Sequence, residues 1–153
     1  MTHAAPRYLL DTNIWIRALR DRAAQESLQR FHQIHGPGEY MSSIVAHELR
    51  AGVRSTVHRR KLERNILDGF ARMGRVITPS DNAWQRAGDL LATLARQDGL
   101  EVSRTAKSFG NDVLLALSCR ESGITLITEN RRDFDRIHRV IPFQFVDRLP
   151  NIT

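Results

Sequence analysis

Four acidic residues stand in four separate segments of an otherwise basic chain: Asp11, Glu48, Asp112 and Asp133. Carboxylate oxygens with few histidines among them favour Mg²⁺ or Mn²⁺ over zinc or copper. Such ions lower the pKa of bound water and stabilise the charge that develops on a phosphoryl group. If the fold brings them together, the four acids predict a site for metal-assisted hydrolysis of a phosphodiester.

Glu48 and Asp112 occupy the same position relative to the apolar residues of their predicted helices. Each acid comes three residues after one apolar residue and one residue before another. The apolar pairs are Val45 and Leu49 around Glu48, and Phe109 and Val113 around Asp112. At 3.6 residues per turn, each acid therefore lies beside the face that packs on the rest of the fold. A charge in that place is costly unless it is paired, hydrogen-bonded or bound to a metal.

Short apolar segments alternate with segments of helical periodicity along the chain. The strands are expected at 8–10, 39–41, 75–78, 124–127 and 142–146, and the helices at about 14–19, 45–53, 58–73, 84–98 and 109–122. This alternation predicts an α/β fold in which a parallel sheet is flanked by helices on both faces.

The ends of two predicted strands carry polar residues. Asp11 follows the first strand directly, and Thr128, Glu129 and Asn130 follow the strand that ends at Ile127. In an open parallel sheet, ligands bind beyond the carboxyl ends of the strands. If these two strands are neighbours, their end residues face the same crevice.

Local signals add detail to these elements. Thr12 or Asn13 can cap the first helix, and Ser42 or Ser43 can cap the second. The segment 58–73 is expected to form one helix. Its apolar face consists of Leu62, Ile66, Phe70 and Met73.

Other segments are defined mainly by their polarity. The stretch 100–107 is polar and is expected to be irregular, so that a new helix begins close to Asp112. Trp15 and Trp84 fall on apolar helix faces, which predicts a place in the core or at an interface. Cys119, beside an apolar helix position, is expected to be a buried thiol.

Each acid, taken alone, also has a purely structural interpretation. Asp11 can cap the helix that follows it, and Glu48 can pair with a nearby arginine. Asp112 can be an early helix residue favoured by the macrodipole, and Asp133 can be a turn residue. The order of the four acids, and the elements that carry them, jointly favour the metal site.

Basic residues outnumber acidic ones by 23 to 17, which gives a net charge of +6. Such an excess favours polyanionic partners, with nucleic acid first and a membrane surface second. Part of it is concentrated in six residues: Arg50, Arg54, Arg59, Arg60, Lys61 and Arg64. This run is either a track for an RNA backbone or a solvated helix face, and the sequence favours neither.

Composition excludes several classes of protein. No apolar run approaches the roughly 18–20 residues of a membrane-spanning helix, and the apolar stretch before Asp11 is too short for a secretory signal. A single cysteine excludes an internal disulfide and a cysteine-rich metal site. With 153 residues, 41% of them hydrophobic, the chain can bury a core. We therefore expect a soluble, cytoplasmic protein of one domain, 1–153.

Four motifs in this order resemble the PIN-domain family, most closely its VapC-type toxin ribonucleases of type II toxin–antitoxin systems. They are Tyr8-Leu9-Leu10-Asp11-Thr12-Asn13, Ser43-Ile44-Val45-Ala46-His47-Glu48-Leu49-Arg50-Ala51-Gly52-Val53, Gly110-Asn111-Asp112, and Ile127-Thr128-Glu129-Asn130-Arg131-Arg132-Asp133-Phe134. The similarity covers about 8–146. It implies a five-stranded parallel sheet, Mg²⁺- or Mn²⁺-dependent cleavage of RNA, an antitoxin partner, and a homodimer whose acidic sites line a shared groove.

The resemblance also assigns roles to residues. Asp11, Glu48 and Asp112 match the three firmest acidic positions, with Asp11 and Asp112 as the principal metal ligands. Asp133 matches the fourth acid, although Glu129 can take that part. The remaining candidates position the substrate: Ser43, which is either a functional hydroxyl or only a cap, and Thr128, Asn130 and Arg50.

A second hypothesis stays open beside the ribonuclease. The chain can be a catalytically silent module of the same fold, whose acidic groove binds RNA or arginine-bearing segments of a partner protein.

Overall fold

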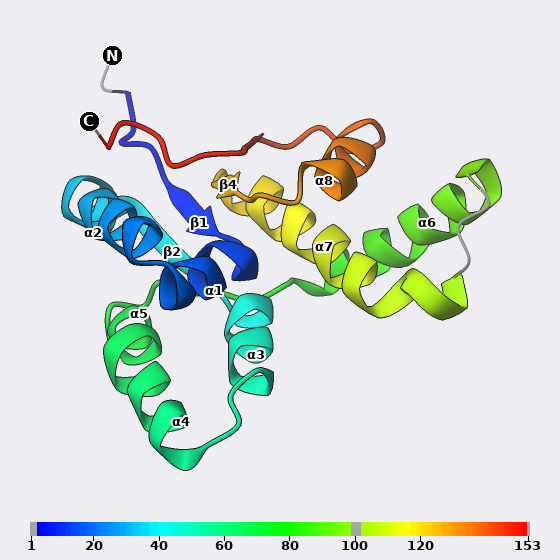
Figure 1. Ribbon diagram of the computed structural model, residues 1–153. Helices are drawn as coiled ribbons and strands as arrows, with labels where there is room; N and C mark the ends of the chain where they lie inside the picture. The colour runs from blue at the N-terminus through cyan, green and yellow to red at the C-terminus, as the bar shows by residue number, and fades with distance from the viewer. Residues whose placement is uncertain (1–2, 99–101, 153) are drawn as a thin grey trace.

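Five parallel strands form the centre of the computed structural model, which describes residues 3–98 and 102–152. They are β1 (Tyr8–Leu10), β2 (Glu39–Ser42), β3 (Val76–Ile77), β4 (Thr125–Ile127) and β5 (Phe145–Val146). Their order in the sheet is β3-β2-β1-β4-β5 (Figure 1). The predicted α/β fold and its parallel sheet are thereby confirmed.

Strands β1 and β4 lie side by side at the centre of the sheet. Leu10, the last residue of β1, pairs with Ile127, the last residue of β4. The two strands therefore end level with each other. The Asp11 amide donates a hydrogen bond to the Ile127 carbonyl at 2.9 Å, so the pairing continues one residue beyond β1. The residues that follow both strands consequently share one edge of the sheet.

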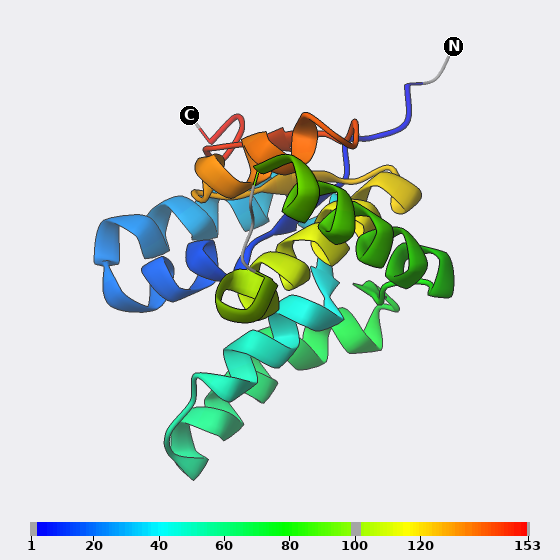
Figure 2. The same cartoon turned by 90° about the vertical axis from the view of Figure 1, so that its right-hand side faces the viewer.

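The helices lie on both sides of this sheet (Figures 1 and 2). Helix α1 packs on α2, and α6 packs on α7. The segment from α3 to α5 forms an arm that projects away from the strands (Figure 2). The bounds are α1 (Thr12–Arg20), α2 (Arg22–His35), α3 (Ser43–Ala51), α4 (Thr56–Leu62), α5 (Asp68–Arg72), α6 (Asp81–Asp98), α7 (Val102–Ser122) and α8 (Arg131–His138), with a 3-10 turn at Gly36–Gly38 and a π-helical turn at Glu63–Leu67.

The core is built where α7 meets the central strands. Leu9, Leu126 and Ile127 are fully buried, and every side chain of α7 from Val113 to Leu117 is buried with them. This continuous burial holds α7 firmly against the sheet, because removal of apolar surface from water is the main stabilising term in folding. Among the described residues, no helix is both long and apolar enough to cross a membrane.

The beginnings of α1 and α3 show how the polar residues after the strands are used. Asp11, and neither Thr12 nor Asn13, caps α1, since its carboxylate accepts the Thr12 amide at 2.8 Å. The expected cap at Thr12 or Asn13 is therefore wrong. For α3 the capping side chain is Ser42, one of the two predicted, and it accepts the Ile44 amide at 3.1 Å.

The segment predicted as a single helix over 58–73 is divided by the π-helical turn at Glu63–Leu67. A π-helical turn contains an extra residue, which rotates the apolar face of the helical segment after the turn. Leu67 is consequently buried in the core, whereas Ile66 is only partly buried and Met73 is 57% exposed. The predicted face of four residues is therefore wrong at its last member.

Helix α7 begins at Val102, so the expectation of an irregular stretch is wrong for 102–107; residues 99–101 lie outside the described residues. Asp112 is accordingly in the middle of the helix, and the interpretation of this acid as an early helix residue is wrong too. Asp133 lies in the first turn of α8 and not in an isolated turn. The prediction missed these helical segments because polar residues gave them no apolar stripe.

The two tryptophans have different environments. Trp15 is buried in the core, as predicted, but Trp84 is 59% exposed on α6. Trp84 therefore does not belong to the core of this chain. Cys119 is buried, as predicted.

Candidate active site

Asp11 lies at the carboxyl end of β1, where its side chain is 6% exposed. Its Oδ2 accepts a hydrogen bond from Thr128 Oγ1 at 2.7 Å, across the β1–β4 pair. Burial raises the pKa of Asp11, while the hydrogen bonds from Thr128 and from the Thr12 amide act in the opposite direction. Asp11 therefore both caps α1 and forms a hydrogen bond with Thr128, the residue that follows β4.

Asp112 faces this aspartate from the middle of α7. Its side chain is 9% exposed, and burial is the main cause that raises its pKa. The negative charges of Asp11, Asp133 and Glu48 raise the pKa further, to about 8. Asp112 therefore interacts with all three of the other predicted acids, which come from three other elements of the fold.

Glu48 is held by residues that directly adjoin the two aspartates. Thr12 Oγ1 donates to Glu48 Oε2 at 2.5 Å, and Asn111 Nδ2 donates to Oε1 at 3.1 Å. Both carboxylate oxygens of this α3 residue are therefore bound, one from α1 and the other from α7. This arrangement fixes the orientation of Glu48 relative to Asp11 and Asp112.

Asn130 joins the last acid to the others. Its Nδ2 lies 3.0 Å from Asp133 Oδ2 and 3.3 Å from Asp112 Oδ2, so the amide donates between two carboxylates. Its backbone amide donates to Thr128 Oγ1 at 3.0 Å. Thr128 and Asn130 thus follow β4 at the edge that it shares with β1, as predicted, and they contact Asp11, Asp112 and Asp133; their role in positioning substrate stays a prediction.

The Glu129 side chain contacts a different part of the fold from Asp133. It forms an ion pair with Arg17 of α1, and both side chains are exposed. Of the two candidates for the fourth acid, Asp133 is therefore the one that the contacts place beside Asp112.

Arg50 and Ser43 lie on another side of α3 from Glu48. Arg50 follows Glu48 by two positions, which corresponds to about 200° around a helix. Arg50 binds Glu63 through two hydrogen bonds, 2.7 and 3.0 Å long, and lines a hollow with Ser43 between α3 and α5. Among the described residues, no contact joins either side chain to the acids, so their role in positioning substrate stays a prediction.

The basic run is partly neutralised within the arm. Glu63 forms ion pairs with Arg50 and with Arg59, and these contacts hold the pKa of Glu63 at about 2. Two of the six predicted basic residues are therefore engaged by one carboxylate. For these two the contacts favour the interpretation as a solvated helix face.

The four acids offer the type of ligand atom that a hard divalent cation prefers. Their oxygens are the ligands such ions prefer, and a cation would offset the repulsion that raises the pKa of Asp112. Among the described residues, no group of three or more His, Cys, Asp or Glu side chains is placed to hold a metal ion. Mg²⁺ does not require such a group, because it keeps several waters and binds through one or two carboxylates.

Three polar residues of the site escaped prediction: Thr12, Asn13 and Asn111. Asn13 Nδ2 lies 3.4 Å from Asp11 Oδ2, and the other two bind Glu48 as described. Their position next to the aspartates could have identified them, because a buried carboxylate needs hydrogen-bond donors and the adjacent polar residues can supply them.

Comparison with known proteins agrees with the motifs. The family model of the PIN domain matches residues 8–140. A protein named Ribonuclease VapC2, from Haemophilus influenzae, is 31% identical over 134 residues, which are 86% of this chain and 92% of that protein. A Shigella flexneri protein named tRNA(fMet)-specific endonuclease VapC is 30% identical over 132 residues, with the same coverage of both chains.

Solved structures share the fold. A DNA-bound VapBC from Salmonella typhimurium has a TM-score of 0.67 at 22% identity, covering 92% of this chain and 97% of its own. VapBC2 from Rickettsia felis, bound to a promoter DNA fragment, has a TM-score of 0.59 at 27% identity, covering 91% and 96%. Because the PIN-domain model matches most of the chain and both named relatives are at least 30% identical over 86% of it, the chain belongs to the PIN-domain family.

Proposed function

We propose that this protein is a metal-dependent endoribonuclease that acts as the toxin of a toxin–antitoxin pair. The observation that carries the proposal is the position of Asp112, whose carboxylate interacts with Asp11, Glu48 and Asp133 beyond the ends of the central strands. Ligands of parallel α/β sheets bind at that edge. The names of the relatives, VapC ribonuclease and endonuclease, support cleavage of RNA over other phosphodiester chemistry.

In this proposal Asp11 and Asp112 hold Mg²⁺ or Mn²⁺, with Glu48 and Asp133 beside them. When bound there, such an ion would lower the pKa of a bound water and offset the charge that develops on the scissile phosphate. The chain's own residues orient the acids. Thr128 fixes Asp11, the amide of Asn130 bridges Asp112 and Asp133, and Thr12 fixes Glu48.

The proposed partners follow from the relatives. Several similar solved structures are named as VapBC or FitAB assemblies, and one is a toxin–antitoxin complex from Klebsiella pneumoniae. We extend this to a cognate antitoxin for the present chain, and to a homodimer. The cytoplasm is the proposed location, because the proposed substrate is RNA.

The decisive experiment is RNA cleavage by the purified protein with Mg²⁺, with Mn²⁺ and with EDTA. Asp112→Asn keeps the shape of the side chain and removes its charge, so cleavage should fall by about 100-fold or more. Asp89→Asn on the exposed face of α6 is the matched control and should cleave like the parent. Equal cleavage by Asp112→Asn and the parent would overturn the proposal.

The silent module is the alternative candidate. It is favoured if the protein binds RNA in EDTA as tightly as in Mg²⁺ and yields no product with either metal. The acidic groove would then be the docking site, and the exposed basic side chains of the arm, among them Arg60 and Lys61, would add attraction for the RNA backbone.

A further inference from the structure

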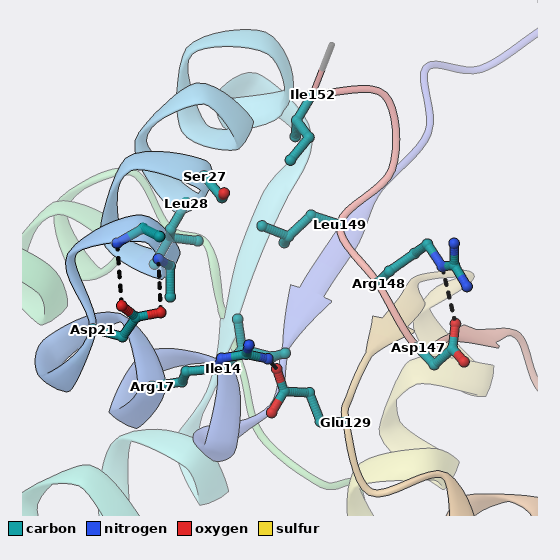
Figure 3. Close-up of a pocket in the computed structure, with 12 residues that line it drawn as sticks. Ile14, Arg17, Asp21, Ser27, Leu28, Glu129, Asp147, Arg148, Leu149 and Ile152 are labelled. Atoms are coloured by element: carbon teal, nitrogen blue, oxygen red, sulfur yellow. Dashed lines mark hydrogen bonds and ion pairs between the residues drawn. The ribbon is translucent and has the colours of Figure 1, made fainter.

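A hollow of about 470 Å³ lies between α1, the start of α2, the residue after Thr128 and the C-terminal segment 147–152 (Figure 3). Its size falls within the range of sites that hold small organic groups. The acids described above do not line it, apart from Glu129, which pairs with Arg17. The hollow is therefore a separate feature of the fold.

The hollow nevertheless adjoins the acidic site. The backbone amide of Glu129 lies 3.4 Å from Asn13 Oδ1, and the same asparagine contacts Asp11 through its Nδ2. Arg17 follows Asn13 by four residues on α1, which is one turn and about 6 Å along the helix axis. Only one helical turn thus separates the lining arginine from the residue that contacts Asp11.

The lining combines an apolar surface with two arginine residues. The apolar side chains are Ile14 of α1, Leu28 of α2, and Leu149 and Ile152 of the C-terminal segment. Arg17 extends from α1 toward Glu129, whereas Arg148 extends from the C-terminal segment away from the hollow, with its guanidinium beside Asp147 (Figure 3). Guanidinium groups bind phosphates through two parallel hydrogen bonds, and they also stack on nucleobases.

Both arginines are in ion pairs that cost little to open. The Arg17 and Glu129 side chains are 60% and 36% exposed, and the Arg148 side chain, 3.6 Å from Asp147, is 87% exposed. Exposed pairs of this kind contribute little stability. A phosphate that approaches Arg17 can therefore replace Glu129 and leave that carboxylate free to accept hydrogen bonds from a base.

The other acids of the lining are occupied. Asp21 accepts the backbone amides of Ala23 and Ala24, both at 3.3 Å, and Asp147 pairs with Arg131 as well as with Arg148. Their charges are thus offset by donors and do not stand free to repel a phosphate.

We propose that this hollow is the subsite for one nucleotide next to the scissile phosphate. The base lies against the apolar surface, and Arg17 binds the adjoining phosphate. The inference rests on the proposed ribonuclease function and extends it to substrate selection. We favour RNA over a protein segment because the hollow lies one helical turn from Asn13, which contacts Asp11, and because the Arg17 guanidinium suits a backbone that carries a phosphate at every residue.

The test uses a short RNA that the parent cleaves at a mapped position. Ala24→Leu fills the hollow, and Arg17→Ala removes the phosphate ligand. The matched controls are Ala92→Leu on an exposed face of α6 and Arg22→Ala, whose exposed side chain has one ion pair, with Glu26. Both test variants should raise KM about 5- to 10-fold with kcat within about twofold, and both controls should match the parent. Arg17→Ala should also lower the slope of log affinity against log salt by about one.

A set of RNAs with a single abasic nucleotide locates the subsite. For the parent, an abasic nucleotide at one position beside the cut should raise KM about as much as Ala24→Leu does. For the Ala24→Leu variant, the same abasic RNA should raise KM no further, since both changes remove the same contact. Thermal melting verifies that each variant is folded.

The outcomes separate this inference from the proposed function. If Asp112→Asn abolishes cleavage while both test variants keep the parent's KM, the subsite is overturned and the ribonuclease stands. If the parent neither binds nor cleaves RNA, the nucleotide subsite and the proposed ribonuclease function are both overturned. If the test variants keep RNA affinity but lose a protein that co-purifies with the parent, the hollow belongs to a protein partner and the nucleotide subsite is overturned.

Discussion

Thr12 Oγ1 donates to Glu48 Oε2 at 2.5 Å, so the residue after the first aspartate fixes the acid of another helix. Asn111, the residue before Asp112, binds the second oxygen of Glu48. The three acids are therefore held in mutual position by the immediate neighbours of two of them. This relationship makes the orientation of Glu48 a property of α1 and α7 as much as of its own helix.

Thr12→Val tests this support. Valine has nearly the shape of threonine but no donor, so Glu48 loses one of its two partners and its orientation. We expect RNA cleavage to fall about 10-fold and the Mg²⁺ concentration for half-maximal cleavage to rise, as for the loss of a group that orients a ligand. Thr93→Val is the control, because within the described residues its hydroxyl bonds only to Asp89 and Arg96 of its own helix, α6. Unchanged metal dependence in Thr12→Val would show that Glu48 does not need this bond.

The raised pKa of Asp112 predicts how stability depends on pH without metal. Its pKa is about 8 in the folded protein and about 3.9 in the unfolded chain, so the folded state binds this proton more tightly. The associated stability is present below pH 4 and is lost as the pH rises towards 8. In EDTA, Asp112→Asn should therefore be more stable than the parent above pH 8, by about 1–3 kcal/mol, with the difference vanishing near pH 4.

Urea unfolding of both proteins between pH 4 and pH 9 measures this difference. Added Mg²⁺ should stabilise the parent at pH 8 and should have little effect on Asp112→Asn, since an ion that binds only the folded state shifts the equilibrium by mass action. A constant difference across the pH range would contradict the raised pKa.

Glu63→Gln tests whether the arm contributes to cleavage. The pKa of Glu63 is lowered to about 2, so its contribution to stability is present above pH 4.5 and is lost as the pH falls towards 2. The pairs with Arg50 and Arg59 are largely exposed, and we expect a loss of only about 0–1 kcal/mol at pH 7. Because Arg50 lies on a different side of α3 from Glu48, kcat/KM for RNA should stay within about twofold of the parent. A tenfold change in either direction would show that these arginines reach the substrate.

Cys119 should be inert in the folded protein. It is fully buried on α7, and burial raises the pKa of its thiol, so the reactive thiolate is scarce. Ellman's reagent should give no rapid colour with native protein and one equivalent of thiol in guanidinium chloride. Rapid reaction of the native protein would mean that α7 opens far more readily than its packing predicts.

The parts of the fold that sequence predicts well are those with a strong local pattern. The apolar run before Asp11 and the one that ends at Ile127 define the two central strands, and their polar ends locate the site. Helix α2 has only two buried side chains, Leu28 and Phe31, so it has no stripe for sequence reasoning to find. Weak amphipathic patterns are overridden by tertiary packing.

The details of the site depend on contacts between distant segments. Nothing near Glu129 in the sequence indicates that Arg17 pairs with it, or that Asp133 is consequently the acid beside Asp112. The extra residue of the π-helical turn, which exposes Met73, likewise has no local signal. Such features follow from the packed structure as a whole.

The parallel pairing of β1 with β4 has a consequence for the making of the protein. Asp11 is synthesised well before Thr128, which fixes it and follows it by 117 positions, and before Asp133, which comes later still. An incomplete chain therefore has neither the neighbouring strand nor the fourth carboxylate. We therefore expect the proposed toxin to be inactive during translation until β4 and the start of α8 have been synthesised and have folded beside β1.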